Sequence, residues 1–246
     1  MDPSQKHRMK KKIMKWGTVS NCKDIVVYGS NLESGLGYPK QLQKHVYPMY
    51  GLPSIQLQII IGLILSDGWL IIDKGNRSIN ARLGLKQSTK NFASFWSVFC
   101  KLSHYCHSLP YLSKKIKNGK LFHTVTFQTR ALPVLTILHN KFYINGVKIV
   151  PVDIKNYLTP ISLAYWIEGD GYSRNKGVAL CTDSFTKDDL KLLIDALTEN
   201  FGFKCTTFPH AKDQYRIHIN SKQMPYLRSL VAPHMHPSML YKLGFK

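Results

Sequence analysis

The sequence predicts an α+β fold made of two similar halves, each with the order helix–strand–strand–helix–strand–strand–helix. Two apolar runs, at residues 60–68 and 163–171, both end in Asp-Gly after a small residue. Their aspartates, Asp67 and Asp170, lie close to half a chain length apart. Alternating apolar and polar residues, the pattern of half-buried strands, follow each run. Repetition at domain-like spacing indicates a duplicated, pseudo-symmetric unit.

The first half has a signal for each expected element. Pro53 and Ser54 mark the start of the first apolar helix. Between Ser78 and Gln87, every second residue from Ile79 to Leu85 is apolar, and these side chains are expected to face one way while the polar residues between them face the other. Asn118-Gly119 is a type I′ turn signal. We expect helices over about 54–67, 91–103 and 132–142, strands over 69–73 and 78–87, and a hairpin over 111–128.

The second half repeats this order. Arg174 to Gly177 forms a turn, and Lys212-Asp213 forms another between two alternating segments. We expect helices over about 160–170, 187–201 and 224–230, and strands over 178–182, 204–209 and 214–220. The chain therefore divides into a basic N-terminal arm and connection (1–48), a first repeat (49–150) and a second repeat (151–246).

Charge indicates the kind of partner. The chain has 34 Lys and Arg against 14 Asp and Glu, a net charge of +20, with 44% apolar residues. Such an excess favours a polyanion such as a nucleic acid. No apolar run reaches the ~18 residues that a membrane span needs, so we expect no membrane partner. The cluster of basic residues at 6–12 is either a solvated tail or an arm over a nucleic-acid backbone.

The two aspartates are the strongest candidates for chemistry. Each is expected at the last turn of a buried helix, where the helix dipole and burial both disfavour a carboxylate. A bound cation would compensate, and side-by-side packing would bring Asp67 and Asp170 together, with Gly62 and Ser66 facing the second helix. Carboxylates together with backbone carbonyls, here those of Ser66 and Gly169, suit Mg²⁺. The alternative is that each aspartate only ends its helix.

Both apolar runs resemble the LAGLIDADG motif of homing endonucleases. The second is the better match, with Leu163-Ala164 at its start and Glu-Gly-Asp-Gly at its end. Its flanks, 157–160 and 182–186, resemble the I-SceI-like branch of monomeric, two-repeat enzymes. The resemblance covers most of residues 49–246. It implies two αββαββα repeats whose sheets form a saddle over DNA, with Asp67 and Asp170 as metal ligands.

The resemblance also suggests further site residues. Lys148 and Lys242 each follow the last helix of their half, at positions of active-site lysines in the I-SceI-like branch. They would polarise the phosphate or relay protons through water; the alternative is two ordinary surface lysines. Gln87 and Asp183, at the ends of the second strands, would order water near the site. For Glu168 we expect an ion pair with a lysine or arginine beside the helix.

The polar faces of the strands are the candidate DNA-reading surface. Two-stranded ribbons fit the major groove, and period-2 alternation turns one face toward it. Strand residues would read base edges and lysines at loop tips would contact phosphate, unless these are ordinary solvated faces. The candidates are Asn80, Arg82, Lys86, Lys114, Lys117, Lys120, Arg174, Lys176, Gln214, Arg216 and His218.

The sequence thus predicts a monomeric, metal-dependent endonuclease specific for a long double-stranded DNA site. The resemblance implies one cut per strand, short 3′ overhangs, a role in intron mobility, and an organellar, mitochondrial location. Mg²⁺ is the expected cofactor, with Mn²⁺ as a substitute and Ca²⁺ supporting binding without turnover. Two alternatives share the fold: an RNA-binding maturase that assists splicing, and a DNA-binding regulator without nuclease activity.

Overall fold

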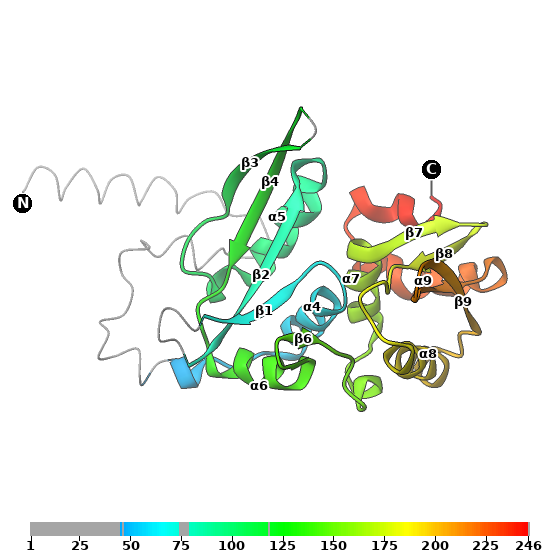
Figure 1. The fold of residues 1–246 in the computed structure, drawn as a ribbon, viewed down its shortest axis with the longest axis horizontal. Coiled ribbons are helices and arrows are strands. Elements are labelled where there is room, and N and C mark those ends of the chain that lie inside the picture. Colours follow the sequence, from blue (N-terminus) through cyan, green and yellow to red (C-terminus); the bar gives the residue numbers. More distant parts are fainter. Residues whose placement is uncertain (1–44, 46, 74–78, 118, 246) are drawn as a thin grey trace, which may run out of the picture.

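The computed structural model describes residue 45 and residues 47–73, 79–117 and 119–245. The expected basic arm therefore lies almost wholly outside the described residues. In the described part, each half of the chain builds one four-stranded antiparallel sheet with its helices. Two helices, α4 (Ser54–Leu65) and α7 (Pro160–Asp170), lie between the sheets, as Figure 1 shows.

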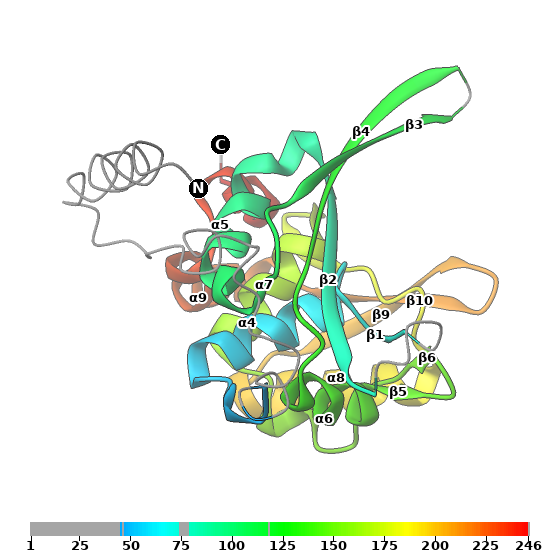
Figure 2. The same ribbon diagram turned by 90° about the vertical axis from the view of Figure 1, so that its left-hand side faces the viewer.

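The first sheet has the strand order β1-β2-β4-β3. Its strands are β1 (Trp69–Ile72), β2 (Ala81–Ser88), β3 (Tyr111–Lys117) and β4 (Lys120–Gln128). Gly119, in the turn between β3 and β4, has φ +70°, which confirms the expected hairpin. This hairpin projects beyond the rest of the molecule (Figure 2). The helices of this half are α4, α5 (Phe92–Leu102) and α6 (Pro133–Phe142).

The second sheet repeats the topology in the order β7-β8-β10-β9. Its strands are β7 (Gly171–Arg174), β8 (Gly177–Leu180), β9 (Cys205–Ala211) and β10 (Gln214–Ile219). The helices are α7, α8 (Lys187–Phe201) and α9 (Met224–Val231), followed by the 3₁₀ helix η7 (Pro237–Leu243). The matching strand orders confirm the predicted repeat of an α+β unit, while the boundaries at residues 48 and 150 stay predictions.

Capping residues explain why the second-half helices begin where they do. The hydroxyl of Thr159 accepts from the N–H of Ser162 at the start of α7, and the Ser162 hydroxyl accepts from the N–H of Thr159. Thr186 and Asp189 form the same reciprocal cap on α8. Each pair satisfies N–H groups that the first helical turn leaves without partners.

One hairpin was absent from the prediction. Strands β5 (Tyr143–Ile144) and β6 (Val147–Lys148) pair through a turn at Asn145 and Gly146, both with positive φ. Asn-Gly is the same turn signal that identified the β3–β4 hairpin. The strands are only two residues long, too short to show alternation, so the turn residues were the only sequence signal. The hairpin matters because it carries Lys148.

Strand β2 begins later than predicted. Alternation suggested a start at Ser78, but the strand starts at Ala81, and Ile79 is 83% exposed rather than buried. The side chain of Asn80 accepts from the hydroxyl of Thr136 in α6, and that hydroxyl also accepts from the N–H of Ala81. Asn80 is therefore directed to a helix of its own half, and its expected place on the polar strand face with Arg82 is wrong.

The α4–α7 contact is a close approach of two backbones. A Cβ on Gly62 would lie 2.4 Å from the carbonyl oxygen of Ser162 and 2.6 Å from the Cβ of Tyr165. A Cβ on Gly169 would lie 2.4 Å from Oγ of Ser66. These distances confirm that Gly62 and Ser66 form the contact face of the first helix. Small residues here let the two helix ends meet side by side.

Gly62→Ala should therefore destabilise the protein by about 2 kcal/mol or more, since overpacking against rigid backbone forces the helices apart. Urea unfolding measures this free energy. Gly51→Ala is the matched control, because a Cβ on Gly51 would meet nothing within 4 Å, and its effect should stay within about 0.5 kcal/mol. Equal effects of the two substitutions would contradict the close approach.

In the described part of the chain, no helix combines the length and the apolar character that a bilayer crossing demands. The apolar side chains instead form one continuous core that includes residues of α4, α7 and both sheets.

Candidate active site

The two aspartates lie at neighbouring helix ends. Asp170 is the last residue of α7, and Asp67 follows Ser66, the residue that caps α4. Asp67 is exposed and Asp170 is partly buried. Burial, and then the negative charge of Asp67, raise the pKa of Asp170 to about 7. The structure thus brings together the two carboxylates that the sequence selected, and their mutual repulsion is only partly compensated.

Glycines after the aspartates let the chain turn tightly. A Cβ on Gly68 would lie 2.7 Å from the carbonyl oxygen of Leu63, and a Cβ on Gly171 would lie 2.7 Å from that of Ile167. Gly68 and Gly171 donate their N–H groups to these same carbonyls. Glycine is therefore required after each aspartate because the backbone of the preceding helix turn leaves no room for a Cβ. The helix ends need no left-handed residue, since neither glycine has a positive φ.

Two lysines reach the same helix ends. Nζ of Lys148 donates to the carbonyl oxygens of Ile64, Ser66 and Gly68, at 2.8, 3.2 and 2.9 Å. Nζ of Lys242 donates to those of Glu168 and Gly169, at 2.6 and 2.7 Å. Each ammonium therefore occupies the negative end of its own half's helix dipole. This pairing contradicts the alternative that they are ordinary surface lysines.

The lysines lie in a partly desolvated environment. Lys242 is 8% exposed. Burial lowers the pKa of both lysines from the usual value, and the charges of Asp67 and Asp170 oppose this shift. Since the charges of Asp67 and Asp170 act on the pKa of each lysine, both ammonium groups lie close enough to both carboxylates to attract them. The site is a compact group of two anions and two cations where the helices meet.

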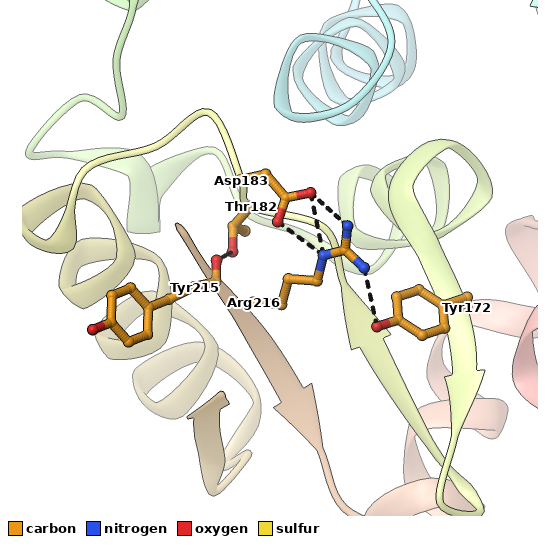
Figure 3. A network of polar contacts seen from close by, with 5 residues as sticks. All are labelled: Tyr172, Thr182, Asp183, Tyr215 and Arg216. Atoms are coloured by element: carbon orange, nitrogen blue, oxygen red, sulfur yellow. Dashed lines mark hydrogen bonds and ion pairs between the residues drawn. The ribbon is translucent and has the colours of Figure 1, made fainter. Parts of the chain in front are cut away.

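Gln87 and Asp183 differ in their surroundings. Nε2 of Gln87 donates to Oδ2 of Asp67 at 2.6 Å, so this side chain lies directly at the site. Asp183 accepts from Nε and from Nη2 of Arg216 at 2.8 and 2.6 Å (Figure 3). Asp183 still lies close enough to Asp170 to raise its pKa slightly. The water-ordering role of both residues stays a prediction, and the contact that Asp183 makes is with an arginine.

Glu168 makes contacts other than those expected. Among the described residues it forms no ion pair; its carboxylate accepts from the hydroxyl of Ser94 and from the N–H of His236. The expected direct partner, a lysine or arginine, is therefore wrong. Lys101, whose charge acts on the Glu168 carboxylate, donates to the Tyr165 hydroxyl at 2.7 Å.

On the second sheet, the candidate DNA-reading residues share one face. Residues paired directly across strands lie on the same face, and Ala179 pairs with both Tyr172 and His218. Alternation adds Arg174, Gln214 and Arg216 to that face. The Arg174 guanidinium lies 3.6 Å from the ring centre of Phe208, and Nη1 of Arg216 donates to the Tyr172 hydroxyl (Figure 3). Lys176 is exposed in the β7–β8 turn.

On the first sheet, Arg82 and Lys86 share a face, and Arg82 pairs with Asp73 at 2.7 Å. Lys86 and Tyr111 both pair with Thr126, which places Lys115 on this face by alternation. Lys114 lies on the opposite face, so Lys115, which is not among the selected candidates, is the residue aligned with Lys86. The side chains of Lys117 and Lys120 lie outside the described residues.

The sequence model of the LAGLIDADG DNA endonuclease family matches residues 57–227. The chain belongs to this family. The match includes α4 from Leu57 onward, all of α7, both aspartates and Lys148, and it stops before Lys242. Assignment to the I-SceI-like branch of the LAGLIDADG family stays a prediction.

Relatives in the LAGLIDADG family include endonucleases and maturases. The probable intron-encoded endonuclease 1 of Wickerhamomyces canadensis is 31% identical over 246 residues, covering 96% of this chain and 99% of that protein. The cytochrome b mRNA maturase bI2 of Debaryomyces hansenii is 32% identical over 191 residues, covering 76% of this chain and 73% of that protein. The solved structure of the homing endonuclease I-WcaI bound to its DNA recognition sequence superposes with a TM-score of 0.78 at 28% identity, covering 90% of this chain and all of that one.

The site of this LAGLIDADG protein has a donor set that fits a divalent cation. Burial and then the charge of Asp67 raise the pKa of Asp170, so ionising both carboxylates is costly, and a doubly charged ion would offset that cost. The carbonyls of Ser66 and Gly169, selected as further ligands, already accept from Lys148 and Lys242. An ammonium beside each carbonyl disfavours a cation there, so Asp67 and Asp170 are the fitting ligands.

Without metal, Asp170→Asn should stabilise the protein more at pH 8 than at pH 5. The folded carboxyl keeps its proton up to a pKa of about 7, whereas the unfolded one releases it near ~3.9. The wild-type free energy of unfolding therefore falls as the pH rises between these values, and the Asn variant lacks this fall. We expect the gain to be roughly 2–3 kcal/mol larger at pH 8, since each pH unit between 5 and 7 changes the free energy by about 1.4 kcal/mol.

Urea unfolding in EDTA at the two pH values measures this gain. Asp195→Asn, at an exposed position on α8, is the control and should show no such difference. A pH-independent gain for Asp170→Asn would show that its folded pKa is not raised.

Proposed function

We propose that this protein is a site-specific double-strand DNA endonuclease that hydrolyses one phosphodiester in each strand with a divalent metal. The observation that carries the proposal is the meeting of Asp67 and Asp170 at the ends of two tightly packed helices, each with a lysine bonded to its end: Lys148, which is partly buried, and Lys242, which is buried. Membership of the LAGLIDADG family and the DNA-bound I-WcaI structure support the choice of DNA as substrate.

In this proposal Asp67 and Asp170 hold Mg²⁺, for which Mn²⁺ substitutes. The metal, when bound, lowers the pKa of water and stabilises the leaving oxygen. Lys242 uses two of its three N–H groups on carbonyls of the described residues and donates the third toward the negative charge that develops on the phosphate. Lys148, whose three N–H groups all bond to carbonyls, stabilises that charge through its own positive charge. The lowered pKa of both lysines makes proton transfer to or from water easier than for an exposed lysine. Gln87 orients the Asp67 carboxylate through its 2.6 Å hydrogen bond.

The two sheet faces would bind a long target as a monomeric saddle. Each sheet has one face with side chains that can donate to or accept from base edges. On the first sheet these are Arg82, Lys86 and Lys115, and on the second sheet they are Arg174, Gln214, Arg216 and His218. The net charge of +20 favours the phosphate contacts. Because a relative is named as a probable intron-encoded endonuclease, we propose that this protein acts in intron mobility and is encoded in a mitochondrial intron. We also propose that its cleavage leaves short 3′ overhangs.

The test is incubation of the protein with a randomised duplex library and Mg²⁺, followed by sequencing of the cut ends. One recurring long sequence cut on both strands is expected, with no product in EDTA. The double variant Asp67→Asn/Asp170→Asn is the control for a contaminating nuclease. Specific binding without cleavage would instead indicate a DNA-binding regulator.

The similarity to a cytochrome b mRNA maturase favours a second candidate function, an RNA-binding maturase that assists splicing. That activity would not need the aspartates to hold metal. A splicing assay with the intron that encodes the protein would separate the two functions. Stimulation of splicing that survives in the double aspartate variant, with no DNA cleavage by the wild type, would favour the maturase.

A further inference from the structure

Glu168 is a buried carboxylate with both oxygens engaged. It is 7% exposed and lies two residues before Asp170. Oε2 accepts from the hydroxyl of Ser94 in α5 at 2.9 Å, and Oε1 accepts from the backbone N–H of His236. Burying a carboxylate is costly unless hydrogen bonds compensate it. A side chain needed only for helix packing would be apolar at this position.

The contact with His236 fixes the start of η7. His236 is the residue before the first turn of this 3₁₀ helix, which runs from Pro237 to Leu243. Lys242 lies near the other end, and its Nζ donates to the backbone carbonyls of Glu168 and Gly169 at 2.6 and 2.7 Å. Glu168 thus contacts η7 at both ends, through its side chain at the start and through its main chain at Lys242.

The first half places its lysine in another way. Leu65 stands at the position that matches Glu168, since Ser66-Asp67 corresponds to Gly169-Asp170. Lys148 comes from β6, whose pairing with β5 fixes its backbone: Tyr143 pairs directly with Lys148. Its Nζ has three carbonyl partners on the α4 end. Within the part of the chain that the structure describes, no carboxylate is hydrogen-bonded to Nζ of Lys148 or to the β5–β6 hairpin that carries it, so the two lysines depend on different supports.

We propose that Glu168 is a positioning residue for Lys242, which holds η7 so that Nζ of Lys242 stays at the end of α7, and that it acts on the cleavage of one DNA strand only. This inference rests on the proposed nuclease function. It predicts that changes at Glu168 slow the strand that Lys242→Met slows and leave the rate on the other strand, which Lys148→Met slows, close to wild type.

The sharpest test removes the N–H that Glu168 accepts. His236 has φ −68° and the preceding Met235 is extended, with ψ 149°. Both values suit a proline at 236, so His236→Pro deletes the donor and keeps the backbone. His236→Ala is the matched control, because it removes the ring and keeps the N–H. Glu168→Leu introduces the residue type that the first half has at the matching position, Leu65. Glu168→Gln retains an acceptor for the N–H of His236 and a group that can bond to Ser94.

The measurement is single-turnover cleavage of a target duplex labelled separately on each strand. We expect Glu168→Leu and His236→Pro to slow the Lys242-dependent strand about 10- to 100-fold, since a displacement near 1 Å costs that much. His236→Ala and Glu168→Gln should stay near wild type on both strands. Metal-free DNA binding should be unchanged in all four.

Equal slowing of both strands by His236→Pro and Glu168→Leu, with a lower melting temperature, would show that Glu168 is only part of the helix packing. Wild-type rates for both variants would also overturn the inference. If Glu168→Leu fails to fold, the His236→Pro and His236→Ala pair still decides. Wild-type protein that cuts neither strand would reject the proposed function itself, a different result from wild-type cleavage that Glu168→Leu does not change.

Discussion

Asp67→Asn and Asp170→Asn should each reduce cleavage of at least one DNA strand about a thousandfold or more. Asn keeps the shape of the side chain and removes the charge that would hold the proposed cation. Metal ions supply several kcal/mol of transition-state stabilisation, and about 4 kcal/mol corresponds to a thousandfold. Nicking and linearisation of a supercoiled plasmid that carries the target site measure the two strand cuts.

Binding without metal should behave differently from cleavage in these variants. Removal of one of two neighbouring carboxylates lowers the repulsion of a phosphate backbone, so metal-free affinity for DNA should stay equal or increase. Ca²⁺ should allow wild-type binding without turnover, because its longer and looser coordination orders an attacking water poorly. Wild-type cleavage rates in either Asn variant, together with a lower melting temperature, would show that the aspartates are structural.

Lys148→Met and Lys242→Met should each slow cleavage about 100- to 1,000-fold, the usual effect of removing a group that stabilises developing charge. Met preserves the length of the side chain and its apolar packing. Because the lysines bond to backbone carbonyls beside the carboxylates, their contribution should arise in the transition state, so the cleavage rate at saturation falls while DNA affinity changes little.

Single-turnover cleavage and binding in EDTA give the two quantities separately. Lys176→Met, in an exposed turn of the second sheet, is the control and should change affinity more than the saturated rate. If Lys148→Met loses affinity and rate in equal measure, the lysine binds phosphate in the ground state and adds nothing to the transition state.

Much of the fold follows from local signals in the sequence. Thr159 and Thr186 mark the starts of α7 and α8 through side chains that bond within three residues. Asn118-Gly119 marks the β3–β4 hairpin, and alternation marks β2 and β10. The caps and the hairpin turn join residues close in sequence, and alternation is a pattern within a single strand, so spacing alone reveals them. Asn80 shows the limit: its partner, Thr136, lies 56 residues away, and alternation could not reveal that contact.

The site was predictable only in part for the same reason. The Asp-Gly motif identified Asp67 and Asp170 in the sequence, and their expected position at the ends of two packed helices predicted that they lie together. The partners of the lysines are backbone carbonyls 73 to 84 residues away, and a carbonyl has no residue type that a sequence could show. Glu168 is similar, since one of its partners is the N–H of His236. Lys114 was selected for its place near a turn, whereas strand register favours Lys115.

The α4–α7 contact has a consequence for how such a protein can evolve after duplication. Gly62 fits against Ser162 and Tyr165, and Gly169 fits against Ser66, so each glycine and its neighbours come from opposite halves. A mutation on one copy that adds volume here must be matched by a loss on the other copy, or both carboxylates at the helix ends shift. The exposed strand faces carry no such mutual restriction. The two copies are therefore free to diverge in the DNA sequence that each would recognise. At the helix pair, by contrast, a substitution in one copy requires a compensating substitution in the other.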